Sequence, residues 1–259
     1  MSNIRHTGRG LAASLTFALG LALAAGSATA QNAQAAHPAV KRAFELPPSA
    51  DLNYDLNARQ RGLALKGDAT VTWRAGDGKY DIKVDSRVAI LGTLLENRSQ
   101  GAIDAFGLAP AEFSEKRARK DPTSITFDRA TKTMRFSESD RSYKLKGGEQ
   151  DRTSITWQLA SVARAAGDKF KPGSEWPFFV AGRSSAEAWT FKVVKREKVQ
   201  TGLGEVDAVL VTREALPGSR DQSVDVWLAP AHEWYPVKIR FTEGDRETIE
   251  QTLKSIGKP

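Results

Sequence analysis

Short runs in which apolar and polar residues alternate dominate the chain from Asp51 onward. Residues 52–56 read LNYDL, and residues 80–84 read YDIKV after the turn sequence Gly76-Asp77-Gly78. Side chains of a β-strand point alternately to its two faces, so each run predicts a strand with one face on a core and the other in water. Turn residues between such short runs predict antiparallel hairpins.

The same alternation returns further along the chain. The further strand candidates are 125–127, 134–136, 143–145, 189–194, 206–211, 224–228, 235–241 and 247–256. The pattern predicts a mainly β fold. We expect a large antiparallel, strongly curved sheet or open barrel of about a dozen strands with one main α-helix.

One segment has a different period and predicts that helix. Residues 151–166 read DRTSITWQLASVARAA, with apolar residues at helical spacing. Asp151 or Ser154 can cap the N-terminus, and Gly167 follows the last turn. The helix either packs on the sheet or forms a lid over a cavity. A second strand-rich half follows, so a division of the domain near residue 170 is an open alternative.

The first thirty residues resemble a secretory signal peptide. Arg5 and Arg9 precede the apolar run 11–25, and Ala28-Thr29-Ala30 offers small residues at a cleavage site. An uncleaved N-terminal anchor is the alternative. We therefore expect a signal peptide over 1–30, a flexible linker over 31–50 and a single β-rich domain over 51–259, with no transmembrane anchor after cleavage.

Composition narrows the compartment and the partners. The chain has no cysteine, which excludes disulfides, thiolate chemistry and lipid attachment to a cysteine at the cleavage site. The formal net charge is +7, or +5 without Arg5 and Arg9, and its charges are mixed along the chain. An exported, cysteine-free chain without a nucleic-acid-binding motif fits the bacterial periplasm, with no nucleic acid as partner.

The densest basic cluster is KRARK at residues 116–120. It is either a solvated loop or a contact with a protein partner or an anionic surface such as lipid headgroups. The residues assigned to such a contact are Lys116, Arg117, Arg119 and Lys120.

Candidate catalytic chemistry is scarce. His232 is the single histidine in the predicted domain, beside Glu233 in a turn, and no G-x-S-x-G pattern occurs. Gly202-Leu203-Gly204 lacks the third glycine of a phosphate-binding motif and predicts a hairpin turn. We therefore assign no catalytic residue, metal site or cofactor, although a pair of carboxylates acting on a glycan stays open as an alternative.

Aromatic residues supply the candidate ligand contacts. The chain has 6 Trp, 4 Tyr and 11 Phe, and DVWLAPAHEWYPVKIRF at 225–241 predicts a hairpin with large apolar groups on both strand faces. Rings of this kind either fill a core or line a cavity. The candidate ligand-binding residues are Trp73, Tyr80, Trp157, Trp189, Trp227 and Tyr235.

Several local patterns together carry a resemblance to a family. They are NRSQGAIDAFGLAP at 97–110, Glu149-Gln150-Asp151 before the helix, and the hairpin at 225–241. With them the chain resembles the exported bacterial family known as domain of unknown function 3108, over roughly residues 50–255. The resemblance implies a compartment and a fold, and no residue roles transfer from it. The architecture is also similar to that of periplasmic lipoprotein carriers, whose incompletely closed sheets shelter acyl chains.

Three functions follow as hypotheses. The first is a non-catalytic periplasmic protein that binds a lipid-like or other amphiphilic ligand in a barrel-like cavity. The second is a structural or interaction protein of the cell envelope without a small ligand. The third is a glycan-active enzyme that uses carboxylates. A large apolar cavity would favour the first hypothesis, and two carboxylates facing each other across a cleft would favour the third.

Overall fold

The fold is seen in a computed structural model that describes residues 37–60, 63–88, 92–214, 223–244 and 247–259. The signal peptide prediction lies outside these residues. The described residues contain 15 strands in one sheet and one α-helix, which confirms the mainly β prediction. The strands are β1 (Ala50–Gln60), β2 (Leu63–Gly76), β3 (Lys79–Val88), β4 (Gly92–Asp104), β5 (Gly107–Arg117), β6 (Thr123–Asp128), β7 (Thr133–Phe136), β8 (Ser139–Lys144), β9 (Glu149–Asp151), β10 (Glu175–Ala181), β11 (Ala186–Thr201), β12 (Gly204–Arg213), β13 (Ser223–Ala229), β14 (Tyr235–Glu243) and β15 (Glu247–Gly257). The helix is α2 (Ser154–Ala166), and short 3-10 turns η1 (Gly167–Lys169) and η2 (Pro230–His232) follow α2 and β13.

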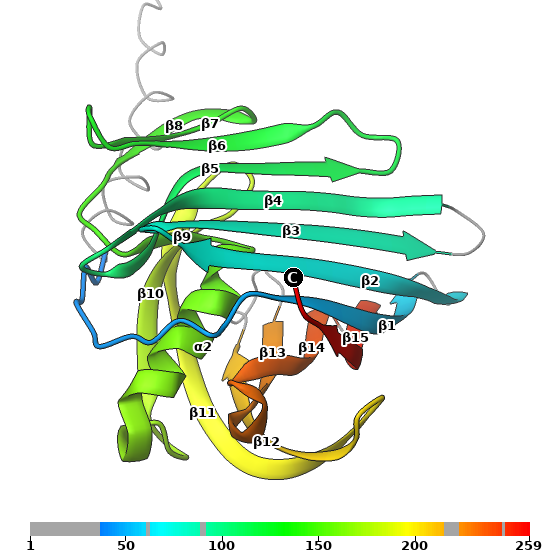
Figure 1. The fold of residues 1–259 in the computed structure, drawn as a ribbon. Coiled ribbons are helices and arrows are strands. Elements are labelled where there is room, and N and C mark those ends of the chain that lie inside the picture. The colour runs from blue at the N-terminus through cyan, green and yellow to red at the C-terminus, as the bar shows by residue number, and fades with distance from the viewer. Residues whose placement is uncertain (1–36, 61–62, 89–91, 215–222, 245–246) are drawn as a thin grey trace, which may run out of the picture.

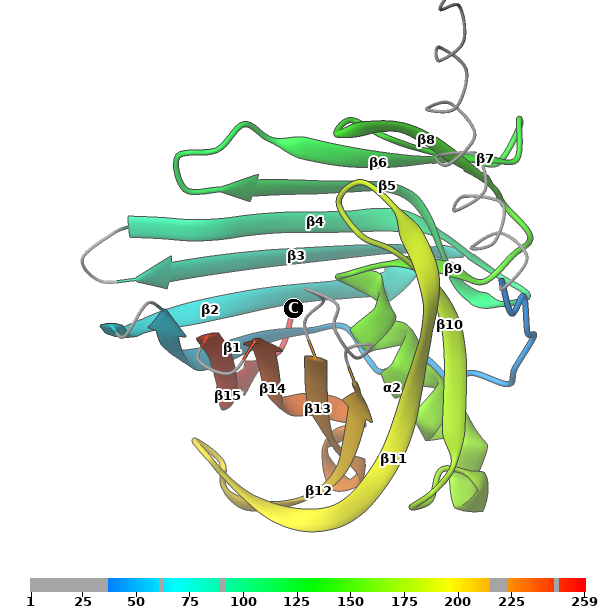
Figure 2. The ribbon, with the colours of Figure 1, turned by 180° about the vertical axis from the view of Figure 1, so that it is seen from behind.

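The sheet is a long meander whose middle is made by its first and last strands. From β1 the chain steps outward strand by strand to β8, and from β10 it steps inward to β15, which pairs with β1. Neighbouring strands are antiparallel except β9 and β10, which are parallel. The sheet curls into an open half-barrel in which β1–β8 form one wall and β10–β15 the other (Figures 1 and 2). The two halves of the chain on either side of residue 170 thus share one sheet.

Alternation along the strands explains which face is concave. In β1, Leu52, Tyr54, Leu56 and Ala58 are buried, whereas the residues between them face outward. Register shifts interrupt several of the strand pairs, and such bulges increase local bending. The sequence therefore builds a sheet with an apolar inner face and a bend.

The helix α2 lies across the inside of the curl, between the two walls (Figure 1). Thr153 occupies the N-cap position and makes no side-chain capping bond. Of the two predicted capping residues, Asp151 contacts the start of the helix, because its carboxylate accepts hydrogen bonds from the backbone N–H groups of Thr153 and Ser154. Most of the helix surface is buried, from Ile155 to Ala163. Because both walls cover it, α2 packs as core rather than as an exposed lid.

The edge strand β9 is joined to the first wall by side-chain hydrogen bonds and not by backbone pairing between strands. Glu149, Gln150 and Asp151 are each 0% exposed. The Gln150 amide donates to the Leu108 carbonyl oxygen of β5 at 2.7 Å, and the Ser99 hydroxyl of β4 donates to Asp151 at 2.5 Å. The sheet is thus fastened at β9 without becoming a closed barrel.

The segment 37–49 lacks helix and strand, as expected of a linker, but it is bound along the domain. The Glu45 N–H donates to the Ser161 carbonyl oxygen of α2 at 2.9 Å. The ring of His37 is 4.2 Å from that of Phe179 and its Nε2 lies 2.9 Å from Glu149. The segment is therefore an ordered N-terminal arm from residue 37 onward, because its backbone and side chains satisfy buried partners.

In the second wall, β11 is a long, strongly bent strand that forms a hairpin with β12 (Figure 2). Its turn at Gly202–Gly204 agrees with the predicted one, and the Gly202 N–H donates to the Leu253 carbonyl oxygen of β15 at 2.8 Å. A Cβ at Gly202 would lie 2.2 Å from the Lys254 carbonyl oxygen. This close backbone approach explains the need for glycine in the turn.

Candidate functional site

Four of the six candidate aromatic residues meet beneath the N-terminal arm. The Trp73 and Trp157 rings stack at 4.5 Å, with Tyr80 6.3 Å from Trp73 and Tyr235 6.1 Å from Trp157. The Trp73 Nε1–H donates to the carbonyl oxygen of Pro47 at 2.9 Å. This aromatic cluster joins β2, β3, α2 and β14, and it fills the concave face where α2 crosses it.

The other two candidates lie apart from this cluster and from each other. The Trp189 ring is 4.4 Å from the guanidinium of Arg213, on β11 and β12. The Trp227 Nε1–H donates to Glu197 at 2.8 Å, and Lys238 lies 5.2 Å from the ring. Trp227 is only 4% exposed, so its ring is part of a packed core.

The concave face has a closed end and an open end. At the closed end, where β2 and β4 finish, the Gln158 side chain accepts from the Leu108 N–H and donates to the Phe106 carbonyl oxygen. These bonds fix α2 against the start of β5. Towards the open end, where β1 and β3 finish, the helix no longer covers the sheet.

A hollow of about 80 Å³ lies between the start of α2 and the open end. We call it the concave groove. Its wall is mostly apolar, and Val84, Leu95 and Phe241 are only half-buried there. The apolar side chains that line it include Val71, Val84, Leu95, Trp157, Ile239 and Phe241. Among the candidate aromatic residues, Trp157 is the one that reaches this groove.

Polar groups also reach the concave groove. Asn97 on β4 and Gln251 on β15 line it, together with Arg152 and Thr153 at the start of α2. An apolar wall with a few placed polar groups is the usual make-up of a small-molecule site. The arrangement can therefore hold an apolar chain and orient one polar group, although the hollow is smaller than the roughly 300 Å³ of a typical ligand pocket.

Buried charges at the closed end have structural partners. Burial alone would raise the pKa of Glu149, but hydrogen bonds from His37 and from the backbone N–H groups of Gly147 and Lys146 lower it to about 2. Arg129 adds an ion pair at 3.1 Å. The Glu149 carboxylate is therefore charged and tied to the arm.

Asp151 is the second buried carboxylate of β9. Burial raises its pKa, while hydrogen bonds from Ser99, Ser154 and Thr153 oppose that rise. Burial and the nearby Asp151 charge raise the pKa of Tyr80, whose hydroxyl lies 3.0 Å from Ser99. Glu149 and Asp151 each face their own backbone and side-chain donors, so these two carboxylates do not form an acid–base pair across a cleft.

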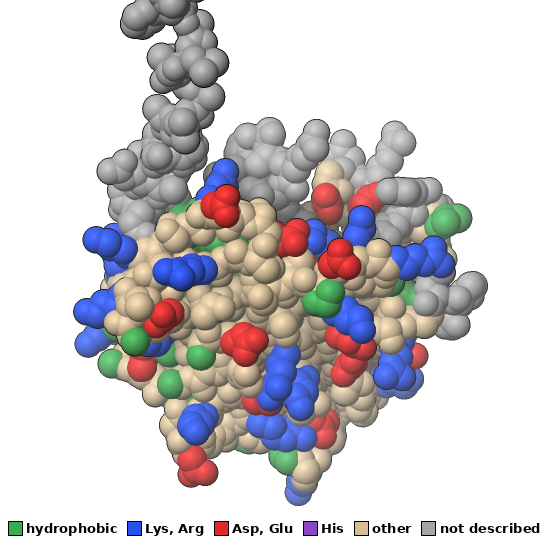
Figure 3. All heavy atoms as spheres, turned by 90° about the horizontal axis from the view of Figure 1, so that it is seen from above, with side chains coloured by type: hydrophobic (Ala, Val, Ile, Leu, Met, Phe, Trp, Pro, Cys, Tyr) green, Lys and Arg blue, Asp and Glu red, His purple; other side chains and the backbone are tan. Residues whose placement is uncertain are grey.

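The basic segment 116–120 forms the end of β5 and the turn after it. Arg117 pairs with Glu115 at 2.6 Å, whereas Lys116, Arg119 and Lys120 are exposed. They border a depression of about 720 Å³ on the outer surface. In the view of Figure 3, basic and acidic side chains are interspersed over the face rather than separated into patches.

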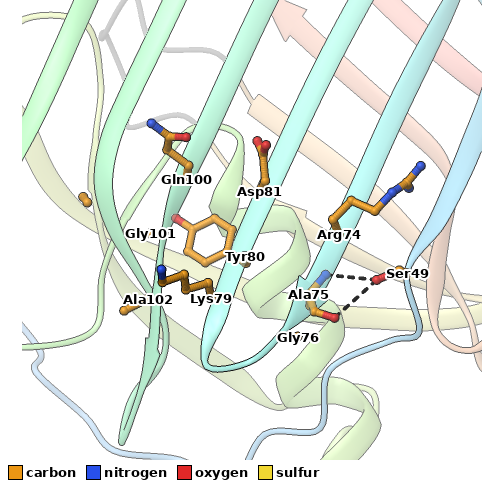
Figure 4. A pocket seen from close by; sticks show the side chains of 11 residues that line it. Ser49, Arg74, Ala75, Gly76, Lys79, Tyr80, Asp81, Gln100, Gly101 and Ala102 are labelled. Carbon is orange, nitrogen blue, oxygen red and sulfur yellow. Dashed lines mark hydrogen bonds between the residues drawn. The ribbon is translucent and has the colours of Figure 1, made fainter. Parts of the chain in front are cut away.

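A second outer depression lies on the convex face near the β2–β3 turn (Figure 4). It measures about 670 Å³ and is shallow, because Gly76, Gly101 and Ala102 leave its floor low between longer neighbours. Arg74 and Asp81 stand at its rim, and Tyr80 lines it from the concave cluster. This depression is an outer surface feature that does not reach the concave groove.

The described part of the chain has neither a cluster of metal-ligating side chains nor a membrane-spanning helix. Within it, no three histidine or acidic side chains come close enough together to hold a metal ion. Over the same residues, no helix has the length and apolar character needed to cross a membrane. His232 lies in the η2 turn, as predicted.

Sequence reasoning missed the polar residues that organise the concave face. Ser99 and Asn97 sit in a strand whose alternation is weak, and Gln150 was considered only as part of a family pattern. His37 was assigned to a linker. The roles of His37, Ser99 and Gln150 depend on contacts between residues more than forty positions apart in sequence. No local pattern reports such a contact.

Comparison with known proteins places this fold. The chain shares 14% identity with a β-barrel-like protein of domain of unknown function 1849 from Brucella abortus, covering 84% of this chain and 99% of that chain with a TM-score of 0.51. That likeness shows a shared fold. A predicted exported protein with a YmcC-like fold from Bacteroides fragilis is 12% identical over 85% of this chain and 100% of that chain, at a TM-score of 0.35. A predicted outer membrane lipoprotein-sorting domain from Vibrio parahaemolyticus is 10% identical over 88% and 89%, at a TM-score of 0.27.

The TM-scores of these two structures are too low to establish a fold shared with this chain. No curated protein matches the sequence. The family model described as "Protein of unknown function (DUF3108)" matches residues 53–254, nearly the whole predicted domain. The match confirms the family that was predicted from the sequence. The description of the family assigns no activity to its members. The chain therefore belongs to the DUF3108 family of proteins of unknown function.

Proposed function

We propose that the protein is a non-catalytic protein of the bacterial periplasm that binds a lipid-like amphiphile in the concave groove. The observation that supports this most is the half-buried apolar wall at the open end. Val84, Leu95 and Phe241 lie on three strands and face one hollow instead of packing fully against one another. Covering such a wall with an acyl chain would gain about 25 cal/mol for each Å² removed from water.

The size of the groove sets a condition on binding. At about 80 Å³ it holds only part of an acyl chain, so the wall must widen to accept a longer one. We expect any widening at the open end, because Gln158 ties α2 to the start of β5 at the closed end. We therefore expect the chain to enter between β4 and β14, past Leu95 and Phe241.

Export to the periplasm is the second part of the proposal. It is supported by the charged, apolar and small-residue order of residues 1–30 and by the absence of cysteine. A periplasmic protein with an apolar groove would meet amphiphiles of the envelope as its available ligands.

Native mass spectrometry of protein purified from its own periplasm tests the proposal. The wild-type protein is expected to carry a co-purified lipid. Val84→Trp would fill the groove and remove that mass, whereas Lys83→Trp, on the exposed face of the same strand, would retain it. Thermal unfolding of all three proteins would show that the variants are folded. Apo protein alone in the wild type, under mild conditions, would count against lipid binding.

A second candidate function is contact with an anionic surface through the basic segment 116–120. The exposure of Lys116, Arg119 and Lys120 beside a depression favours it. Sedimentation with phosphatidylglycerol vesicles at low salt is expected to capture the protein, and about 0.5 M salt is expected to release it because charges are screened. Capture that is equal on neutral phosphatidylcholine vesicles would refute a charge-based contact.

A further inference from the structure

Two neighbouring strands of the concave face each carry a buried side-chain atom that has no hydrogen-bond partner among the described residues. These atoms are Oγ of Ser86 on β3 and Oδ1 of Asn97 on β4. Ser86 is only 2% exposed. In the strand ladder, Ser86 pairs with Leu95 and Val84 pairs with Asn97, so Ser86 and Asn97 are diagonal neighbours on one face. The Cβ atoms of diagonal neighbours in an antiparallel sheet lie at most about 8 Å apart.

An unpaired buried polar atom is costly. Such an atom loses its hydration without gaining a hydrogen bond, and native proteins usually satisfy it by protein groups, water or a ligand. Ser99, two residues beyond Asn97 on β4, shows the usual solution, because it bonds both Tyr80 and Asp151. Asn97 and Leu95 line the hollow, and Ser86 is the cross-strand partner of Leu95 on the same face of the sheet.

We propose that the concave groove recognises a hydroxyl group of its amphiphile, held between Ser86 and Asn97. A hydroxyl can donate to Asn97 Oδ1 and accept from the Ser86 hydroxyl at the same time, which matches both unpaired atoms. The ligand chain then lies along Val84, Leu95 and Phe241. This inference rests on the proposed lipid binding and names the ligand class, a neutral hydroxylated amphiphile such as a monoacylglycerol.

The uncharged side chains of Ser86 and Asn97 favour a neutral headgroup. Ser86 and Asn97 carry no charge, and an anionic headgroup placed between them would lose hydration without gaining an ion pair. Arg152, at the start of α2, is the charged residue that also lines the hollow. A fatty-acid anion directed to Arg152 is therefore the competing ligand that the experiment must separate.

Titration calorimetry with three ligands of equal chain length tests the inference. They are monodecanoylglycerol, which has free hydroxyls, methyl decanoate, which has none, and decanoate, which is charged. The wild-type protein is expected to bind monodecanoylglycerol about tenfold more tightly than methyl decanoate, as for one or two hydrogen bonds. The double variant S86A/N97L is expected to bind both equally. The control D85A/E96L, altered at neighbouring positions that point to the other face, is expected to keep the tenfold preference.

The outcomes separate this inference from the proposed function. Equal binding of monodecanoylglycerol and methyl decanoate by the wild-type protein would overturn hydroxyl recognition and leave lipid binding intact. Tighter binding of decanoate would overturn the neutral headgroup. If none of the three ligands binds, the proposed function fails. Unliganded S86A/N97L is expected to melt at or above the wild-type temperature, and a loss of several degrees would show that the two atoms have internal partners.

Discussion

The buried carboxylate of Glu149, which joins the N-terminal arm to β9, predicts a specific dependence of stability on pH. Glu149 is fully buried, and hydrogen bonds from His37, Gly147 and Lys146 outweigh burial and lower its pKa from 4.5 to about 2. At 1.36 kcal/mol for each pH unit, this difference corresponds to about 3 kcal/mol of folding free energy. Because the folded-state pKa is the lower one, that contribution is complete above pH 4.5 and is lost as pH falls towards 2.

The variant Glu149→Gln removes the charge and is expected to lower the free energy of unfolding by about 3 kcal/mol at pH 7. Urea denaturation at a series of pH values would measure it. The difference from wild type should shrink between pH 4.5 and 2, while Glu214→Gln, at an exposed position, should stay within about 0.5 kcal/mol throughout. A deficit of the same size at pH 7 and pH 2 would refute the charge-based explanation.

Two further predictions concern the second wall. Gly202→Ala is expected to destabilise the protein by about 1–3 kcal/mol, since its Cβ would meet the Lys254 backbone. The control Gly76→Ala has open space around its Cβ and should leave the melting temperature nearly unchanged. Equal effects of the two substitutions would show that the hairpin backbone does not lie in close contact with β15. Trp227→Ala is expected to cost about 3–5 kcal/mol in urea denaturation, as for a large buried ring, and an unchanged unfolding midpoint would mean that the ring is exposed in solution.

The hydrophobic pattern predicted the strands well because each strand has one buried face. Alternation at residues 52–56 and 80–84 marks β1 and β3, and the 225–241 segment forms the predicted hairpin of β13 and β14. The three additional strands beyond a dozen are explained by short elements such as β9, which has only three residues. A run of that length is too short to show a period.

The candidate site was less predictable, because it depends on contacts distant in sequence. Rings were the expected ligand contacts, yet Trp73 is 0% exposed and Trp157 alone among the six lines the groove. The sequence pattern distinguishes apolar from polar positions, but it does not report whether a neighbouring element covers an apolar position. Alternation with Tyr80, Ile82 and Val84 places Ser86 on the buried face of β3, but no sequence pattern reports that its hydroxyl lacks a partner.

Photo-crosslinking tests the central claim, lipid binding in the concave groove, most directly. The probe is a monodecanoylglycerol with a diazirine in its acyl chain, and peptide mass spectrometry locates the label after irradiation. The account predicts label on Val84, Leu95 or Phe241, which unlabelled monodecanoylglycerol competes away. Label confined to the outer depression at Lys79 and Ala102, or no label that competitor removes, would contradict it.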